Sequence, residues 1–200
     1  MIPSGSLFIT GTDTDVGKSV AAAWLMEKMG ADYWKPIQAG LDGETDRDVV
    51  ERLSGLPKSH FHPTTFNLTS PLSPHEAARR DGVKIQLQDF ILPTSKRELI
   101  VEGAGGLLVP LNEKDFIIDL IQLLKLPAVL VARSGLGTIN HTLLSLDQLR
   151  QRKIPIAGVI INGPINPGNR QAIMDYGQVD IIGEIPHLTP LNAKTLSAIR

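Results

Sequence analysis

Short apolar runs alternate with longer amphipathic stretches along the whole chain. The short runs are rich in β-branched residues and bounded by glycine or proline, which is typical of strands buried on both faces. They cover residues 6–10, 32–35, 98–102, 128–132, 156–161 and 181–185. The longer stretches have helical spacing and cover residues 17–29, 116–124, 139–151 and 170–176. In the third of these, Leu143, Leu146 and Leu149 recur about one turn apart and form one apolar face.

This alternation predicts an α/β protein with one domain over residues 1–200, built as a mostly parallel sheet with helices on both faces. Ligands of such sheets bind beyond the carboxyl ends of the strands. Glycine and polar residues gather after four predicted strands, in residues 11–19, 103–106, 134–138 and 162–164. Residues 39–93 are less regular and rich in proline and histidine, so we expect an excursion over the edge of the sheet.

Composition excludes several classes of protein. The absence of cysteine removes disulfides, thiol catalysis and thiolate metal sites. Twenty basic and 21 acidic side chains leave a net charge of −1, which argues against nucleic acid or anionic lipid as a partner. No apolar stretch reaches the roughly 18 residues of a membrane span, and no signal-peptide pattern is visible. We therefore expect a cytoplasmic protein with no membrane partner.

The clearest chemical signal lies in residues 10–19, Thr-Gly-Thr-Asp-Thr-Asp-Val-Gly-Lys-Ser, which follow a predicted strand and open a helix. Backbone N–H groups and the positive helix end of such a loop hold phosphate oxygens. Lys18 would reach the terminal phosphates, and the Ser19 hydroxyl would ligate Mg²⁺. The first glycine of the usual motif falls at Thr12, with Gly11 one residue earlier, so the motif is a variant. The alternative, an ordinary capped turn, is disfavoured by the strand–loop–helix context.

Carboxylates and a second lysine follow other predicted strands. Mg²⁺ takes about six oxygen ligands, so Ser19 needs one or two carboxylate partners. Glu102 ends a strand where the second acid of a phosphate-loop protein normally lies, although it could instead cap a local amide. Asp46 is the other candidate, and it could equally be a helix N-cap. Lys35, at a strand end before Pro36, could hold an anionic nucleophile against the γ-phosphate.

Other charged residues carry no clear chemical pattern. The five histidines have no ligand spacing. We expect His60 and His62 to be solvated in a loop, and His141 to lie on a helix surface. Arg79 and Arg80 are expected on a solvated helix face.

Several segments, in order, resemble the dethiobiotin synthetase family of the biotin pathway. They are residues 10–19, Lys35-Pro36-Ile37-Gln38-Ala39-Gly40, Ser73-Pro74-His75, Val101-Glu102-Gly103-Ala104-Gly105-Gly106, Gly137-Thr138-Ile139-Asn140-His141, Asn162 and Gly183-Glu184-Ile185-Pro186. The resemblance covers nearly the whole chain. It implies a P-loop NTPase-like fold and an ATP- and Mg²⁺-dependent cyclo-ligase.

The resemblance also implies the reaction. One amine of 7,8-diaminopelargonic acid takes up CO₂, supplied as CO₂ or bicarbonate, to give a carbamate. The carbamate attacks the γ-phosphate of ATP, and the second amine closes the mixed anhydride to give dethiobiotin, ADP and phosphate. A carbamate is an anionic nucleophile, in agreement with the role considered for Lys35.

The resemblance finally implies the site residues. Those acting at the reacting groups are Lys18, Lys35 and Thr14, and those holding Mg²⁺ are Ser19, Asp46 and Glu102. Those binding the nucleotide are Asp15, Val16, Gly17, Lys18, Ser19, Val20, Asp46, Glu102, Gly103, Ala104, Gly105, Asn162 at the adenine edge, Pro186, His187 and Leu188. Those binding substrate are Ala39 and, around its carboxylate, the partner subunit's Gly137, Thr138, Ile139 and Asn140 in a homodimer.

One position departs from the family pattern. Many members carry a hydroxyl side chain at the position of Ala39, so Gln38 or a backbone group would have to replace that substrate contact.

Two other functions stay open at this point. A partition or division-site ATPase switch has a related loop, but such proteins carry a lysine at the position of Asp13. A non-catalytic ATP-binding scaffold would leave Lys35 and Asp46 unconstrained. Nucleotide hydrolysis that depends on diaminopelargonate plus bicarbonate would separate the three functions.

Overall fold

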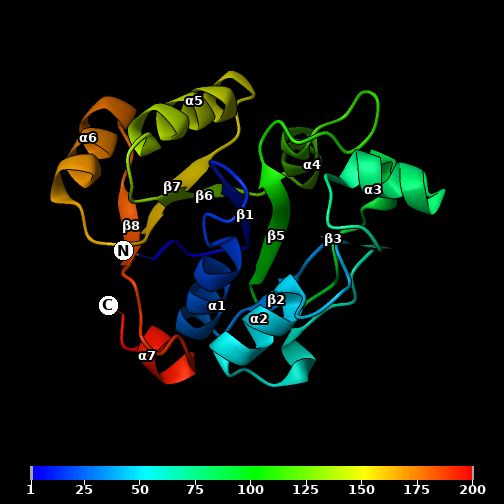
Figure 1. Ribbon diagram of the computed structural model, residues 1–200, viewed down its shortest axis with the longest axis horizontal. Coiled ribbons are helices and arrows are strands. Elements are labelled where there is room, and N and C mark those ends of the chain that lie inside the picture. The colour runs from blue at the N-terminus through cyan, green and yellow to red at the C-terminus, as the bar shows by residue number, and fades with distance from the viewer. Residues whose placement is uncertain (1, 200) are drawn as a thin grey trace.

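Six parallel strands form the centre of the molecule (Figure 1). The computed structural model describes residues 2–199. In spatial order the strands are β2 (Asp32–Trp34), β5 (Leu99–Gly106), β1 (Leu7–Gly11), β6 (Ala128–Arg133), β7 (Ile156–Asn162) and β8 (Ile181–Ile185). Every neighbouring pair is parallel. The predicted α/β class with a parallel central sheet is therefore confirmed.

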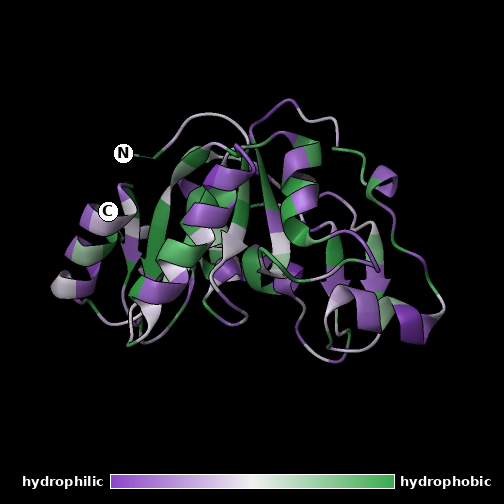
Figure 2. Ribbon diagram, turned by 90° about the horizontal axis from the view of Figure 1, so that it is seen from above, coloured by the Kyte–Doolittle hydropathy of each residue, from purple (hydrophilic) through white to green (hydrophobic). Residues whose placement is uncertain are grey.

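Helices cover both faces of this sheet, because alternate strand residues point to opposite sides. One face packs on α1 (Lys18–Met29), α2 (Asp46–Ser54) and α7 (Ala193–Ser197). The other face packs on α4 (Ile117–Leu124), α5 (Thr138–Gln151) and α6 (Pro167–Gly177). Figure 2 shows hydrophobic strands between helices whose surfaces are mixed. None of the helices within residues 2–199 is long and apolar enough to cross a membrane.

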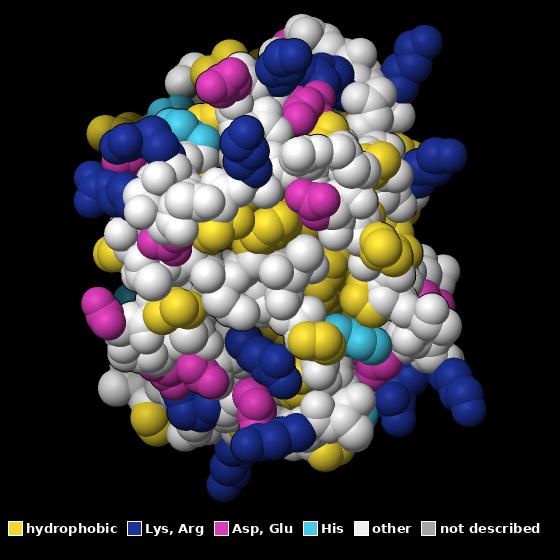
Figure 3. Space-filling view, turned by 90° about the vertical axis from the view of Figure 1, so that its right-hand side faces the viewer, with side chains coloured by type: hydrophobic (Ala, Val, Ile, Leu, Met, Phe, Trp, Pro, Cys, Tyr) yellow, Lys and Arg dark blue, Asp and Glu magenta, His cyan; other side chains and the backbone are white. Residues whose placement is uncertain are grey.

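The irregular excursion holds more structure than its sequence indicates. After β2 the chain forms β3 (Ile37–Ala39), α2, the 3₁₀ turn Lys58–His60, β4 (Phe66–Leu68), α3 (Pro74–Asp81) and the 3₁₀ turn Leu87–Asp89. Strands β3 and β4 pair in parallel as a separate two-stranded sheet, so the excursion is a folded unit after β2. On the surface seen from the side of α3, charges of both signs are interspersed with hydrophobic side chains (Figure 3).

The expectation that both excursion histidines are solvated is wrong. His60 is 8% exposed, and its Nδ1 lies 3.0 Å from the Ala31 carbonyl and 3.2 Å from Asp32 Oδ1. The buried Nε2 of His62 lies 3.5 Å from Asp32 Oδ2. Both rings therefore surround the buried carboxylate of Asp32 at the start of β2.

The remaining charged side chains are closer to expectation. Arg79 and Arg80 are exposed on α3, where both guanidinium groups donate to Glu76. His141 lies half-buried on α5, with its Nδ1 3.2 Å from the Arg133 guanidinium.

Candidate active site

The phosphate loop joins the carboxyl end of β1 to the first turn of α1. Gly17 has a φ of 92°, a left-handed conformation that favours glycine. A Cβ at this position would lie 2.1 Å from Nδ2 of Asn162, which donates a 3.0 Å hydrogen bond to the Val16 carbonyl. Asn162, at the end of β7, therefore holds the loop from a strand on the far side of β6. The loop acids Asp13 and Asp15 are exposed.

Lys18 bends back over this loop. Its ammonium donates to the Asp13 carbonyl at 3.0 Å, and the residue is 8% exposed. Burial lowers the pKa of Lys18, and the nearby charge of Lys35 lowers it further, against the opposing effect of the site carboxylates. The ammonium group therefore lies within the loop that would receive phosphates.

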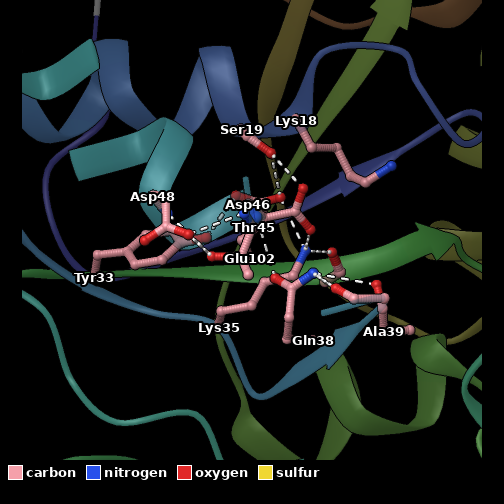
Figure 4. A network of polar contacts seen from close by, with 12 residues as sticks. Lys18, Ser19, Tyr33, Lys35, Gln38, Ala39, Thr45, Asp46, Asp48 and Glu102 are labelled. Carbon is pink, nitrogen blue, oxygen red and sulfur yellow. Dashed lines mark hydrogen bonds and ion pairs between the residues drawn. The ribbon is translucent and has the colours of Figure 1, made fainter. Parts of the chain in front are cut away.

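Three oxygen-bearing side chains meet beside the loop (Figure 4). The Ser19 hydroxyl lies 2.9 Å from Glu102 Oε1 and 3.2 Å from Asp46 Oδ1. The three residues come from α1, β5 and α2, so the site depends on the sheet edge and on the excursion together.

The helix-cap alternative for Asp46 is wrong. Thr45 is the N-cap of α2, with its side chain accepting from the Asp48 amide in a reciprocal capping box. Asp46 is the first residue inside the helix, so its carboxylate is not needed for capping and faces Ser19 instead.

The donor chemistry of this cluster fits Mg²⁺, which prefers hard oxygen ligands and is usually held by one or two carboxylates together with substrate phosphates. Ser19, Asp46 and Glu102 supply such oxygens next to a phosphate loop. Across the described part of the chain, no group of three or more histidine or acidic side chains is arranged to hold a metal alone. Phosphate oxygens and water would complete the ligand set.

Lys35 occupies the centre of the same cluster. Its ammonium lies 2.6 Å from Asp46 Oδ2, 3.0 Å from Glu102 Oε1 and 3.0 Å from the Gly103 carbonyl. Burial disfavours the charged form, but the charges of Glu102 and Asp46 outweigh burial and raise the pKa of Lys35. A buried, fully hydrogen-bonded ammonium therefore stands beside the phosphate loop.

Tyr33 contacts the cluster, although the sequence does not single it out. Its hydroxyl donates to Glu102 Oε2 at 2.8 Å. Burial, and then the neighbouring charge of Glu102, raise the pKa of Tyr33 well above 10, so the phenol stays protonated. The sequence offered one hint: Tyr33 places a hydroxyl in a strand that is buried throughout, where a polar group needs a hydrogen-bond partner.

Gln38 is engaged elsewhere than expected. Its Oε1 accepts from the Asp46 amide at 3.2 Å, while its Nε2 donates to the carbonyls of Ala39 at 3.2 Å and Gly40 at 3.4 Å. The amide therefore ties the loop after β3 to the start of α2. Because these backbone contacts use its oxygen and its NH₂ group, Gln38 is poorly placed to replace the missing hydroxyl at Ala39.

The other predicted residues lie further along the carboxyl edge. Gly137 is the N-cap of α5, where Thr138 is buried and Asn140 is exposed. Residues 186–188 follow β8, and Leu188 packs against the core on the α1 face. Within residues 2–199, no hydrogen bond or ion pair joins residues 137–140 to the cluster formed by Ser19, Lys35, Asp46 and Glu102.

Comparison with known proteins finds relatives that are similar in sequence and others that share only the fold. Residues 5–195 match the family described as an AAA domain. An ATP-dependent dethiobiotin synthetase of Paramagnetospirillum magneticum is 52% identical over 193 residues, 96% of this chain and 93% of that protein. One of Rhodopseudomonas palustris is 48% identical over 192 residues, 96% of this chain and 92% of that protein. Among solved structures, a ParA family ATPase from Chlorobium tepidum is 14% identical and has a TM-score of 0.57. The match spans 96% of this chain and 90% of that one.

The strand, the Gly-Lys-Ser loop and the following helix, with a second acid at the end of β5, define a P-loop nucleotide-binding protein. Identity of 45–52% over nearly the full length then narrows the class. The chain belongs to the family of ATP-dependent dethiobiotin synthetases. The resemblance and the ligase class predicted from the sequence are therefore confirmed, whereas the likeness to a partition-type ATPase shows a shared fold alone.

Proposed function

We propose that this protein closes 7,8-diaminopelargonic acid with CO₂ or bicarbonate to dethiobiotin, at the expense of ATP. The observation that carries the proposal is Lys35, a 2%-exposed ammonium between two carboxylates and beside the phosphate loop. A partition-type switch carries its second lysine within the phosphate loop, at the position of Asp13, whereas a cation at the position of Lys35 can hold an anionic nucleophile against the transferred phosphate.

In the proposed reaction, a carbamate oxygen forms a bond to the γ-phosphorus of ATP while the bond from that phosphorus to the ADP oxygen breaks. The second amine then attacks the carbamoyl carbon, phosphate leaves, and the amine loses a proton. Lys35 uses all three N–H donors on Asp46, Glu102 and Gly103, so holding the carbamate means exchanging one of these acceptors for a carbamate oxygen.

Lys18 is proposed to hold the terminal phosphates, and Thr14 to face the reacting amine. Ser19, Asp46 and Glu102 would hold Mg²⁺, which when bound neutralises phosphate charge and orients the transferred group. The remaining nucleotide contacts are proposed for the loop backbone around residues 15–20 and 103–105, Asn162 at the adenine edge, and residues 186–188.

We further propose a homodimer in which residues 137–140 of one subunit bind the substrate carboxylate of the other. An open hollow of about 380 Å³ supports this, because it borders the phosphate loop at Thr14 and α5 at His141. Leu108 and Leu144 line this hollow and are 54% and 59% exposed. Exposed apolar side chains that lie together are typical of an interface.

The direct test is a coupled assay with ¹³C-bicarbonate. We expect ADP to form only when diaminopelargonate and bicarbonate are both present, together with dethiobiotin that carries one labelled carbon by mass spectrometry. ATP hydrolysis that ignores either co-substrate, or turnover without labelled dethiobiotin, would contradict the proposed function.

A further inference from the structure

The two oxygens of Glu102 have different partners. Oε1 accepts from Ser19 at 2.9 Å and from Lys35 at 3.0 Å, so it faces the site. Oε2 accepts from the Tyr33 hydroxyl at 2.8 Å. Glu102 is 1% exposed, and an unbonded carboxylate oxygen would be costly at such burial. Tyr33 therefore supplies the bond on the side of Glu102 that faces away from Ser19 (Figure 4).

The backbone register explains why Tyr33 reaches this oxygen. Tyr33 of β2 lies opposite Ile100 of β5, and residues two apart on a strand share a face. Glu102 is thus the diagonal neighbour of Tyr33 on one face of the sheet, within reach of a long side chain.

The ring itself is held from the other side. Tyr33 is 0% exposed, and its ring packs at 57° against Phe61, with centroids 5.7 Å apart. The Tyr33 carbonyl also accepts from the His62 amide at 2.9 Å. The hydroxyl therefore comes from a side chain with little freedom to move, which is what orienting a ligand requires.

We propose that Tyr33 is a positioning residue for the divalent metal, holding Glu102 so that Oε1 stays directed at Ser19 and Asp46. The inference rests on the proposed function only in assigning a metal to these oxygens. Tyr33 touches neither substrate nor metal in this scheme and acts through the orientation of Glu102.

The test is Tyr33→Phe, which keeps the ring and removes only the hydroxyl. Using Mn²⁺ as the probe in the presence of ADP, we expect metal affinity to fall about 10- to 100-fold, the usual effect of losing a bond to a metal-ligating side chain. Metal-free ADP binding should not change. Excess Mg²⁺ should restore most of the activity, which a merely structural loss would not allow.

The chain provides a matched control, because its only other tyrosine is Tyr176, 76% exposed on α6. Tyr176→Phe should leave Mn²⁺ affinity unchanged. An unchanged Mn²⁺ affinity in a folded Tyr33→Phe variant would overturn the proposal.

A second measurement covers the case in which Tyr33→Phe does not fold. In Tyr176→Phe protein labelled with ¹³C at the tyrosine Cζ, the single resonance belongs to Tyr33. Paramagnetic broadening of that resonance by Mn²⁺–ADP, and a chemical-shift change with the diamagnetic Mg²⁺–ADP, are expected. Bound metal that leaves the resonance untouched would refute the proposal.

Failure of this inference can be told apart from failure of the proposed function. Wild-type protein that makes dethiobiotin, with Tyr33→Phe binding Mn²⁺ normally, would remove only the role of Tyr33. Weakened Mn²⁺ binding in Tyr33→Phe, with no dethiobiotin from the wild type, would leave the positioning role intact and remove the proposed reaction.

Discussion

The ammonium of Lys35 lies 2.6 Å from Oδ2 of Asp46, which joins the end of β2 to the first residue of α2. Glu102 completes the contact from β5 at 3.0 Å. One positive charge thus stands between two carboxylates in a place where Lys35 and Glu102 are almost fully buried. Buried charges of this kind are tolerated because they compensate each other, so the loss of one changes the surroundings of the others.

Replacing Lys35 by alanine is expected to lower kcat about a hundredfold or more, roughly 3 kcal/mol, because a preorganised charge beside the transferred phosphate is lost. ATP affinity should change little, since the polar partners of the Lys35 ammonium are Asp46, Glu102 and the Gly103 carbonyl rather than groups of the phosphate loop. Steady-state kinetics with ATP and diaminopelargonate varied separately measure both quantities. Lys96→Ala, at an exposed lysine, is the control, and near-normal turnover in Lys35→Ala would exclude a catalytic role for Lys35.

The Lys18→Ala variant should behave differently. Its ammonium lies over the loop backbone, 3.0 Å from the Asp13 carbonyl, where phosphates would bind. We expect ATP affinity to fall because a contact to the bound phosphates is lost, and turnover to fall by about a hundredfold because that contact strengthens as charge develops on the transferred phosphate. Calorimetric titration with ATP checks the affinity. Unchanged ATP binding would contradict a phosphate-binding role.

Substitutions at Thr45 and Asp46, the adjacent residues at the start of α2, should separate metal binding from helix capping. Asp46→Asn keeps shape and removes charge, so the half-saturating Mg²⁺ concentration should rise while the Thr45 N-cap of α2 is kept. Thr45→Ala removes the N-cap and should cost about 1 kcal/mol of unfolding free energy without moving the Mg²⁺ titration. Mg²⁺-dependent kinetics and denaturant unfolding of both variants measure the contrast. A normal Mg²⁺ titration for Asp46→Asn would remove Asp46 from the metal site.

Half of this site was predictable from the sequence because strand ends of a parallel sheet share one edge. Residues such as Lys35 and Glu102 follow apolar runs, so their place beside the phosphate loop follows from the alternation of strands and helices. The role of Asp46 could not be settled, because it depends on how the excursion folds back.

The excursion itself was hard to predict for a physical reason. Strands β3 and β4 have three residues each and pair only with one another, so neither shows a period. Its helices did carry local signals, including the capping box from Thr45 to Asp48. The start of α6 was missed similarly: the Asn166 cap and Pro167 begin it three residues before the predicted position. The contact between Tyr33 and Glu102 could not be predicted, because it depends on the register between β2 and β5, which sequence periodicity does not give.

The buried carboxylate of Asp32 should shape acid stability. Burial alone would raise the pKa of Asp32, but hydrogen bonds from Ser95 at 2.5 Å and Arg97 at 3.1 Å, with nearby charge, outweigh it and lower the pKa below 3.8. The folded state therefore binds this proton more weakly than the unfolded chain. Its stabilising contribution is fully present above the unfolded-state pKa, about pH 4, and is lost as pH falls through the lower folded-state pKa.

For Asp32→Asn we accordingly expect the unfolding free energy at pH 7 to fall by about 1–3 kcal/mol, the range for losing hydrogen bonds to a buried charged group. The difference from wild type should shrink as pH falls below about 4, because Asp32 of the unfolded chain takes up a proton there before Asp32 of the folded state does. Urea unfolding from pH 2 to pH 7 tests this. A difference that stays constant over this range would show that the ionised carboxylate is not the source of the stability.

The proposed homodimer leads to a complementation experiment. Each site would combine Lys35 and the phosphate loop of one subunit with Asn140 of the other. Asn140 is exposed at the start of α5, so Asn140→Asp should fold normally and repel the substrate carboxylate. Lys35→Ala and Asn140→Asp homodimers should each be weak, because both of their sites are defective.

A mixed dimer of these two variants should recover activity. Both defects fall in one site, built from the Lys35→Ala subunit and its Asn140→Asp partner, and the second site then contains only native residues. By site counting under two-fold symmetry, each heterodimer should show up to about half the wild-type activity. Native mass spectrometry measures how much heterodimer forms, so activity can be expressed per heterodimer. If exchange is complete and activity stays at the level of the parents, the substrate carboxylate is bound within one subunit and the shared site is excluded.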